Sequence, residues 1–192
     1  MAQTFPTHAV LGVTVAQAML TTGIVQIHGP LEFVLALSAG VFGGGAPDTV
    51  MLPEYYWDKY VKRIQPMTEE GPVTMFLKEV THSVFTWAVA IFLWSMFFPA
   101  GEMRNLGLVF LFCALFAGVV PDVFTHTEER FRKTDPTFLY PISHIVGIRI
   151  RCHKPEWEYR KAHGDRSMKE WEKSLNFWVS VIFLVLFLMY FI

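Results

Sequence analysis

Two long apolar runs joined by a short polar turn constrain this chain more than any other feature of its sequence. Residues 84–98 and 106–120 contain no charged side chain. With its flanks, each run is long enough to cross a hydrocarbon core of about 30 Å as a helix that rises about 1.5 Å per residue. Residues 76–122 are therefore predicted to form a pair of antiparallel membrane spans.

The composition of the whole chain agrees with a membrane protein. The 192 residues are 53% hydrophobic and 16% aromatic, and the mean hydropathy is +0.35, which is too apolar for an ordinary soluble domain. The formal net charge of −1 gives no reason to expect a nucleic-acid partner. The two cysteines are not expected to pair, because Cys113 lies within a predicted span and Cys152 in a polar segment.

Three more apolar segments complete an all-α, polytopic membrane fold with about five transmembrane helices. We predict one membrane domain over residues 1–192, with a polar segment at 123–173 and spans at about 9–28, 31–46, 76–98, 105–121 and 174–192. The break at Gly29 and Pro30 is so short that the first two spans must be antiparallel neighbours. Three glycines at 43–45 followed by Pro47 predict that the second helix ends there in a tight, non-helical turn.

The distribution of basic residues predicts the orientation in the membrane. Of the sixteen Lys and Arg residues, four lie in 49–78 and eleven in 123–173, whereas the turn of the central hairpin holds Arg104 alone. Loops rich in Lys and Arg remain in the cytoplasm. The N-terminus and the two basic segments are therefore expected inside, and the C-terminus outside.

Four polar side chains are predicted to meet at the cytoplasmic ends of the spans: His8, Asp48, His82 and Asp122. Histidine and carboxylate groups are ligands typical of Zn²⁺ or Mn²⁺, and polar residues within spans are costly enough to indicate function. Any one of them alone is better explained as a helix cap or a hydrogen-bonded residue. Their shared position at one membrane face favours a metal site.

Five short motifs carry a resemblance to a known family. In order they are Thr-His-Ala-Val-Leu-Gly at 7–12, Gly-Ala-Pro-Asp at 45–48, Thr-His-Ser at 81–83, Asp-Val-Phe-Thr at 122–125 and Leu-Tyr-Pro-Ile-Ser at 139–143. This series resembles that of the YdjM-like family of bacterial inner-membrane proteins, described as metal-dependent hydrolases and distantly similar to zinc-dependent phospholipase C and related nucleases. The resemblance implies a multi-pass protein of the inner, cytoplasmic membrane.

The resemblance also implies roles for individual residues. It makes His8, Asp48, His82 and Asp122 metal ligands, with zinc as the expected ion, and makes Thr81 and Thr125 positioning groups. Two ligands of the family pattern are absent, because Gly118 stands where the family has a histidine, and Val50 stands where it has a second aspartate.

His126 is one candidate to replace the missing histidine. It follows Asp122 by four residues, so the two share a face if the helix continues through Thr125, whereas a turn after Pro121 would separate them. Further possible ligands follow nearby in the sequence, namely Glu128, Glu129 and His144. Loss of the site is the other possibility, which leaves a protein retained for its shape.

Two functions follow from these observations. The first is a membrane-embedded metal-dependent hydrolase acting on a phosphoester or lipid-type substrate at the cytoplasmic face, with Glu128 or Asp48 as general base and no catalytic residue assigned. The alternative is a non-catalytic structural subunit of a larger membrane complex with a degenerate metal site. Both place the chain in a lipid bilayer, with other membrane subunits as possible partners. The remaining histidines, His28, His153 and His163, are assigned to structure or solvent.

Overall fold

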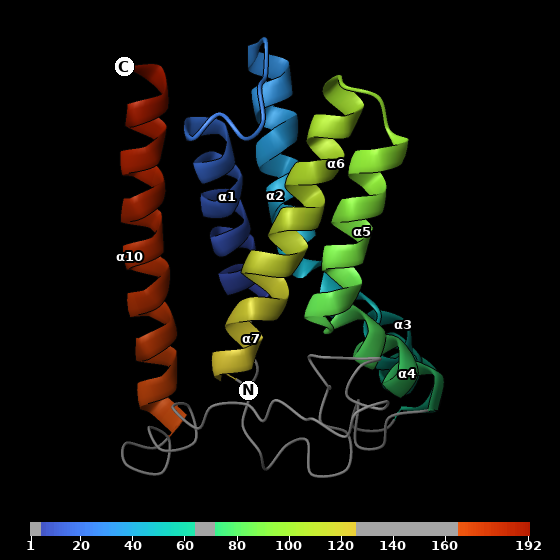
Figure 1. Cartoon of the computed structure of the whole chain (residues 1–192). Coiled ribbons are helices and arrows are strands. Elements are labelled where there is room, and N and C mark those ends of the chain that lie inside the picture. Colours follow the sequence, from blue (N-terminus) through green and yellow to red (C-terminus); the bar gives the residue numbers. More distant parts are fainter. Residues whose placement is uncertain (1–4, 64–71, 126–164) are drawn as a thin grey trace.

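The protein is a bundle of helices that stand side by side (Figure 1). The structure is a computed structural model that describes residues 5–63, 72–125 and 165–192, and it contains no strand within these ranges. The helices are α1 (Phe5–Thr21), α2 (Pro30–Thr49), α3 (Leu52–Tyr56), η1 (Trp57–Lys62), α4 (Pro72–Thr81), α5 (Val84–Phe97), α6 (Glu102–Cys113), η2 (Ala114–Val119), α7 (Val120–Thr125) and α10 (Asp165–Phe191). The described part of the chain is therefore mostly helical, which agrees with the predicted all-α class.

Several of these helices are long and apolar enough to cross a membrane. Three qualify on their own, at Pro30–Thr49, Glu102–Asp122 and Lys173–Phe191. The pair α4 and α5 qualifies as a fourth span only if its two parts are taken together across a bend of 62°. Helix α1 has 17 residues, which gives a length of about 26 Å.

Helix α1 ends earlier than the sequence predicts. The predicted span extends to residue 28, but the helix stops at Thr21. Gly23 has a φ of 73°, a left-handed conformation that glycine adopts without steric cost and that commonly ends a helix. The chain then turns and enters α2 at Pro30.

Helix α2 shows that the predicted turn at 43–47 is wrong. The helix continues through the three glycines and Pro47 to Thr49. The glycines serve close packing instead, because a Cβ atom at Gly44 would lie 2.3 Å from the carbonyl oxygen of His8, and one at Gly43 would lie 2.4 Å from that of Phe110. Small residues allow membrane helices to approach at the backbone, and neighbouring helices make an internal proline tolerable.

The predicted third span is broken in two. Helix α4 ends at Thr81 and α5 begins at Val84, so His82 and Ser83 form the corner between them. Ser83 caps α5 by accepting a hydrogen bond from the backbone N–H of Thr86 at 3.3 Å. The indole N–H of Trp87 donates to the carbonyl of Thr81 at 2.6 Å and ties α5 to the end of α4.

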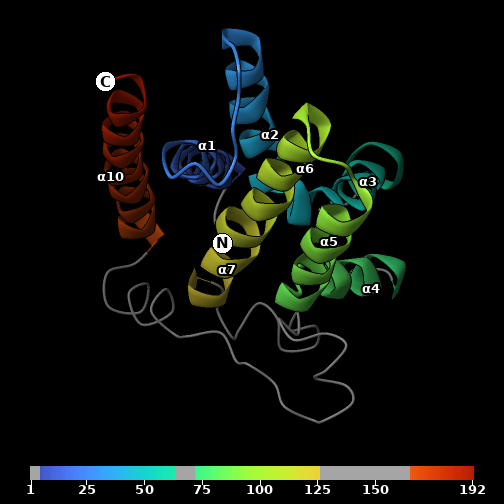
Figure 2. The same ribbon diagram turned by 45° about the horizontal axis from the view of Figure 1, so that its top comes forward.

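The core lies between α1, α2 and α6, and α10 packs against its outer side. Ala16, Leu20, Ala36, Val109 and Cys113 are buried in this core. Figure 2 shows α10 next to α1 and away from α5. The contact between α1 and α10 is partly polar, because the side-chain amide of Gln17 and the hydroxyl of Thr21 both donate to the carbonyl of Leu186, at 3.1 and 3.2 Å.

Candidate metal centre

Four helix ends meet at the end of the bundle that carries the N-terminus. His8 lies near the start of α1, Asp48 near the end of α2, His82 at the corner between α4 and α5, and Asp122 in α7. Figure 1 shows that these ends of α1, α5 and α7 lie at the same level. The structure thus brings together the four residues that the sequence predicts to converge.

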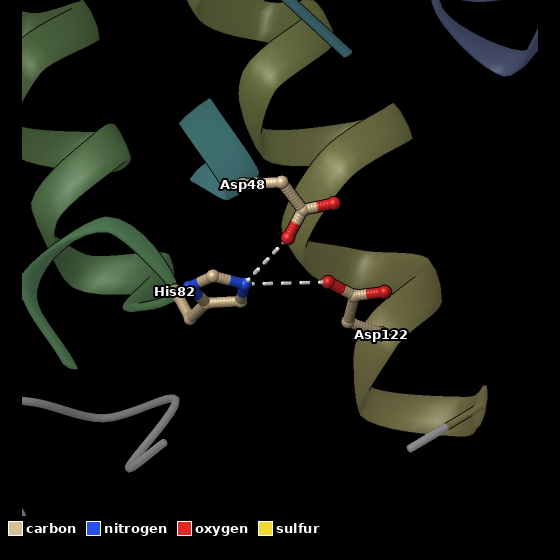
Figure 3. Close-up of side chains that lie close together, drawn as sticks. All are labelled: Asp48, His82 and Asp122. Atoms are coloured by element: carbon tan, nitrogen blue, oxygen red, sulfur yellow. Dashed lines mark hydrogen bonds and ion pairs between the residues drawn. The ribbon is translucent and has the colours of Figure 1, made fainter. Parts of the chain in front are cut away.

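The four side chains form a ring in which imidazoles and carboxylates alternate. His82 Nε2 lies 3.3 Å from Asp48 Oδ1 and 3.6 Å from Asp122 Oδ2 (Figure 3). His8 Nε2 lies 3.5 Å from Asp48 Oδ2 and 3.5 Å from Asp122 Oδ1. We call this set the His/Asp ring.

Backbone carbonyls orient both imidazoles. His8 Nδ1 is 2.8 Å from the carbonyl oxygen of Ala117, and His82 Nδ1 is 3.0 Å from that of Lys78. Because a carbonyl only accepts, each Nδ1 donates to its carbonyl, and this directs each Nε2 at the carboxylates. Such bonds to the second ring nitrogen are usual for histidines that bind metals.

Pro121 explains why the Ala117 carbonyl can serve His8. In a regular helix this carbonyl would accept from the backbone N–H four residues later, but residue 121 is a proline and has no N–H. The stretch Ala114–Val119 is also wound as a π-helix rather than an α-helix. The Ala117 oxygen therefore points to α1, 109 residues away in the sequence.

The ring is almost closed to solvent. The side chains of His8 and Asp122 are each 1% exposed and that of His82 is 0% exposed, whereas the Asp48 side chain keeps 22% of its surface. Asp48 therefore marks the accessible edge of the ring. Thr81 supports this edge. Its hydroxyl donates to the carbonyl of Pro47 at 3.0 Å and so links α4 to the last turn of α2, which carries Asp48.

Gly118 is a packing residue in this structure and leaves no room for a histidine. A Cβ atom at this position would lie 2.7 Å from Pro47 Cγ and 2.8 Å from the carbonyl oxygen of Gly44. Gly118, which stands where the family has a histidine, thus allows η2 to approach the part of α2 that carries Asp48.

Other predicted residues lie outside the described part of the chain. These are His126, Glu128, Glu129 and His144, and the side chain of Thr125 is also outside it. Helix α7 does continue through Pro121 to Thr125, which is the condition stated above for Asp122 and His126 to share a helix face. The sequence analysis did not identify the two carbonyls that orient the imidazoles, nor the role of Trp87. Pro121, four residues after Ala117, was a usable signal for the carbonyl of Ala117.

The residues present fit a divalent metal ion. The donor atoms of Asp48, His82 and Asp122 all lie within 4.8 Å of one another. Donors around a tetrahedral zinc with bonds of about 2.0–2.1 Å are separated by about 3.3–3.5 Å. The four contacts of the ring, at 3.3 to 3.6 Å, agree with this spacing.

Comparison with known proteins supplies the family. No curated protein matches the chain, and no solved structure matches it. The model of the YdjM inner membrane protein family matches residues 2–192. The several apolar helices described above agree with the membrane location that this family's description states. The chain is thus a multi-pass inner-membrane protein that belongs to the YdjM family.

Proposed function

We propose that the protein is a membrane-embedded, metal-dependent hydrolase that acts on a phosphoester or lipid-type substrate at the cytoplasmic face of the membrane. The observation that carries this proposal is the His/Asp ring, in which the Nε2 atoms of two imidazoles and the oxygen atoms of two carboxylates face one another in a buried space. Converging electron-pair donors repel one another unless a cation lies between them.

A divalent cation satisfies this arrangement. The donors are nitrogen and oxygen atoms without a thiolate, a set that suits zinc or manganese, and zinc is the ion we propose. A bound divalent ion supplies Lewis acidity and a water of lowered pKa.

The chain's own residues determine orientation and access. The carbonyls of Ala117 and Lys78 hold the two imidazoles in the metal-binding tautomer. Asp48 borders the direction from which a substrate can approach, because it alone in the ring is partly exposed. Of the two candidates for the group that accepts a proton, Asp48 belongs to the His/Asp ring, so we propose Glu128.

We also propose a topology of five spans in one membrane domain. It adds α1 and the combined α4 and α5 to the three helices that qualify as spans on their own. The basic residues in 49–78 and 123–173 support a cytoplasmic position for the N-terminus and hence for the His/Asp ring.

Hydrolysis by the full chain in lipid nanodiscs tests the proposal. We expect Zn²⁺-dependent or Mn²⁺-dependent cleavage of bis(p-nitrophenyl) phosphate or of phospholipid, abolished by Asp122→Asn and retained by Glu102→Gln at the other end of the same span. A protein that binds metal and cleaves neither substrate would contradict the hydrolase proposal. That result would favour the alternative, a non-catalytic subunit of a larger membrane complex.

A further inference from the structure

The His/Asp ring contains one more histidine than the three-residue group of candidate ligands. That group comprises Asp48, His82 and Asp122, whose donor atoms lie within 4.8 Å of one another. His8 adds a second imidazole, whose Nε2 lies 3.5 Å from an oxygen of each carboxylate.

His8 nevertheless faces the same two carboxylates through their other oxygens. His82 Nε2 approaches Asp48 Oδ1 and Asp122 Oδ2, whereas His8 Nε2 approaches Asp48 Oδ2 and Asp122 Oδ1. Each carboxylate thus presents one oxygen to each imidazole. This is the arrangement of two metal positions that share a pair of bridging carboxylates.

The surroundings of His8 Nε2 suit a metal ligand. This nitrogen is buried and makes no hydrogen bond within the described residues. It lies at an equal 3.5 Å from Asp48 Oδ2 and Asp122 Oδ1, which is the spacing of neighbouring ligands around an ion.

We propose that the ring is a dinuclear centre in which Asp48 and Asp122 bridge two divalent ions, one bound by His82 and the other by His8. This inference deepens the proposed function and rests on it. Each ion receives one nitrogen and two oxygens from the chain. Two divalent ions and two carboxylates leave a net charge of +2, which favours an anionic substrate such as a phosphoester over a neutral carboxylic ester.

Metal titration of the full chain tests the inference without an activity assay. The chelator-treated protein in detergent is titrated with Mn²⁺ alone, and bound metal is measured by equilibrium dialysis and by electron paramagnetic resonance. We expect two equivalents in the unchanged protein and a spin-coupled signal when both are bound. His8→Ala should bind one equivalent without coupling, and the exposed His28→Ala should still bind two.

Each other outcome contradicts a defined part of the account. One equivalent in the unchanged protein would overturn the dinuclear centre and leave the proposed function standing. No bound metal would overturn the proposed function itself. Two equivalents in His8→Ala would remove His8 as a ligand. His8→Gln, which keeps most of the side-chain volume, replaces His8→Ala if that variant loses its helical circular dichroism.

Discussion

The two ends of the bundle both gather histidine and carboxylate side chains, but in different ways. At the end remote from the N-terminus, His28, Glu102 and Asn105 line a hollow of about 410 Å³. There the backbone N–H of His28 donates to Glu32 Oε2 at 2.8 Å, and the His28 side chain is exposed. At the other end, the two imidazoles of the His/Asp ring are buried and directed at two carboxylates.

The difference lies in what holds the side chains. The hydrogen bond between His28 and Glu32 joins residues four apart in the sequence, whereas the bond that orients His8 reaches Ala117, 109 residues away. A cluster that solvent can reach needs no counter-ion, but a buried one must be compensated within the fold. Residue types alone therefore do not identify a metal site. The substitutions that follow change the same residue type at each of the two ends.

The largest effect should come from removing one histidine at each end. His82→Ala deletes a nitrogen that would bind the metal directly. We expect metal affinity to fall by more than about 100-fold, because loss of a group that only hydrogen-bonds a metal ligand typically costs about 10–100-fold. His28→Ala should leave the affinity unchanged. Competition with a fluorescent zinc chelator measures both. Equal affinities in the two variants would remove the distinction between the ends.

The next largest effect should come from adding one methyl group to a glycine. Gly44→Ala places a Cβ atom 2.3 Å from the carbonyl oxygen of His8, so α1 and α2 must separate. We expect a loss of about 1–3 kcal/mol in the free energy of unfolding, together with weaker metal binding.

Gly29→Ala is the matched control for this substitution. Nothing lies within 4 Å of a Cβ atom at Gly29, and its φ of −174° suits any residue. Detergent denaturation followed by circular dichroism compares the two variants. A Gly44→Ala protein as stable as Gly29→Ala would show that close helix packing does not hold the ring together.

A smaller effect is expected from removing one hydroxyl group. Thr81→Val loses the hydrogen bond to the Pro47 carbonyl that supports the Asp48 edge, and metal affinity should fall about 10-fold. Thr22→Val removes a hydroxyl that bonds the carbonyls of Ala18 and Met19 at the adjoining end of α1, so it should have no effect on metal affinity. The same chelator competition applies. An unchanged affinity in Thr81→Val would assign Thr81 to local structure.

The positions of the ring residues could be predicted because they follow from topology. His8, Asp48 and Asp122 each lie near one end of a predicted span, and antiparallel spans bring alternate ends to one face. The orientation of the two imidazole rings could not be predicted in the same way. The carbonyls of Ala117 and Lys78 carry no side-chain signal, and their role depends on how distant helices pack.

Glycine and proline account for most of the errors in helix limits. Sequence rules treat both as breaks, yet Gly44 and Pro47 lie inside α2, because packing against neighbouring helices outweighs their low helix propensity. Gly118 was interpreted as a lost ligand because the family pattern has a histidine there, whereas in the structure it allows close packing against Pro47 and Gly44. Gly23 does end a helix, and it alone of these residues has a positive φ.

The metal content of the purified chain tests the central claim most directly. The full protein is extracted in detergent without chelators, and its zinc and manganese are measured by inductively coupled plasma mass spectrometry beside the His82→Ala variant. We expect at least one equivalent of divalent metal in the unchanged protein and one equivalent less in His82→Ala. A folded protein that contains no metal, and whose melting temperature does not rise on addition of Zn²⁺ or Mn²⁺, would contradict the assignment of the His/Asp ring as a metal centre.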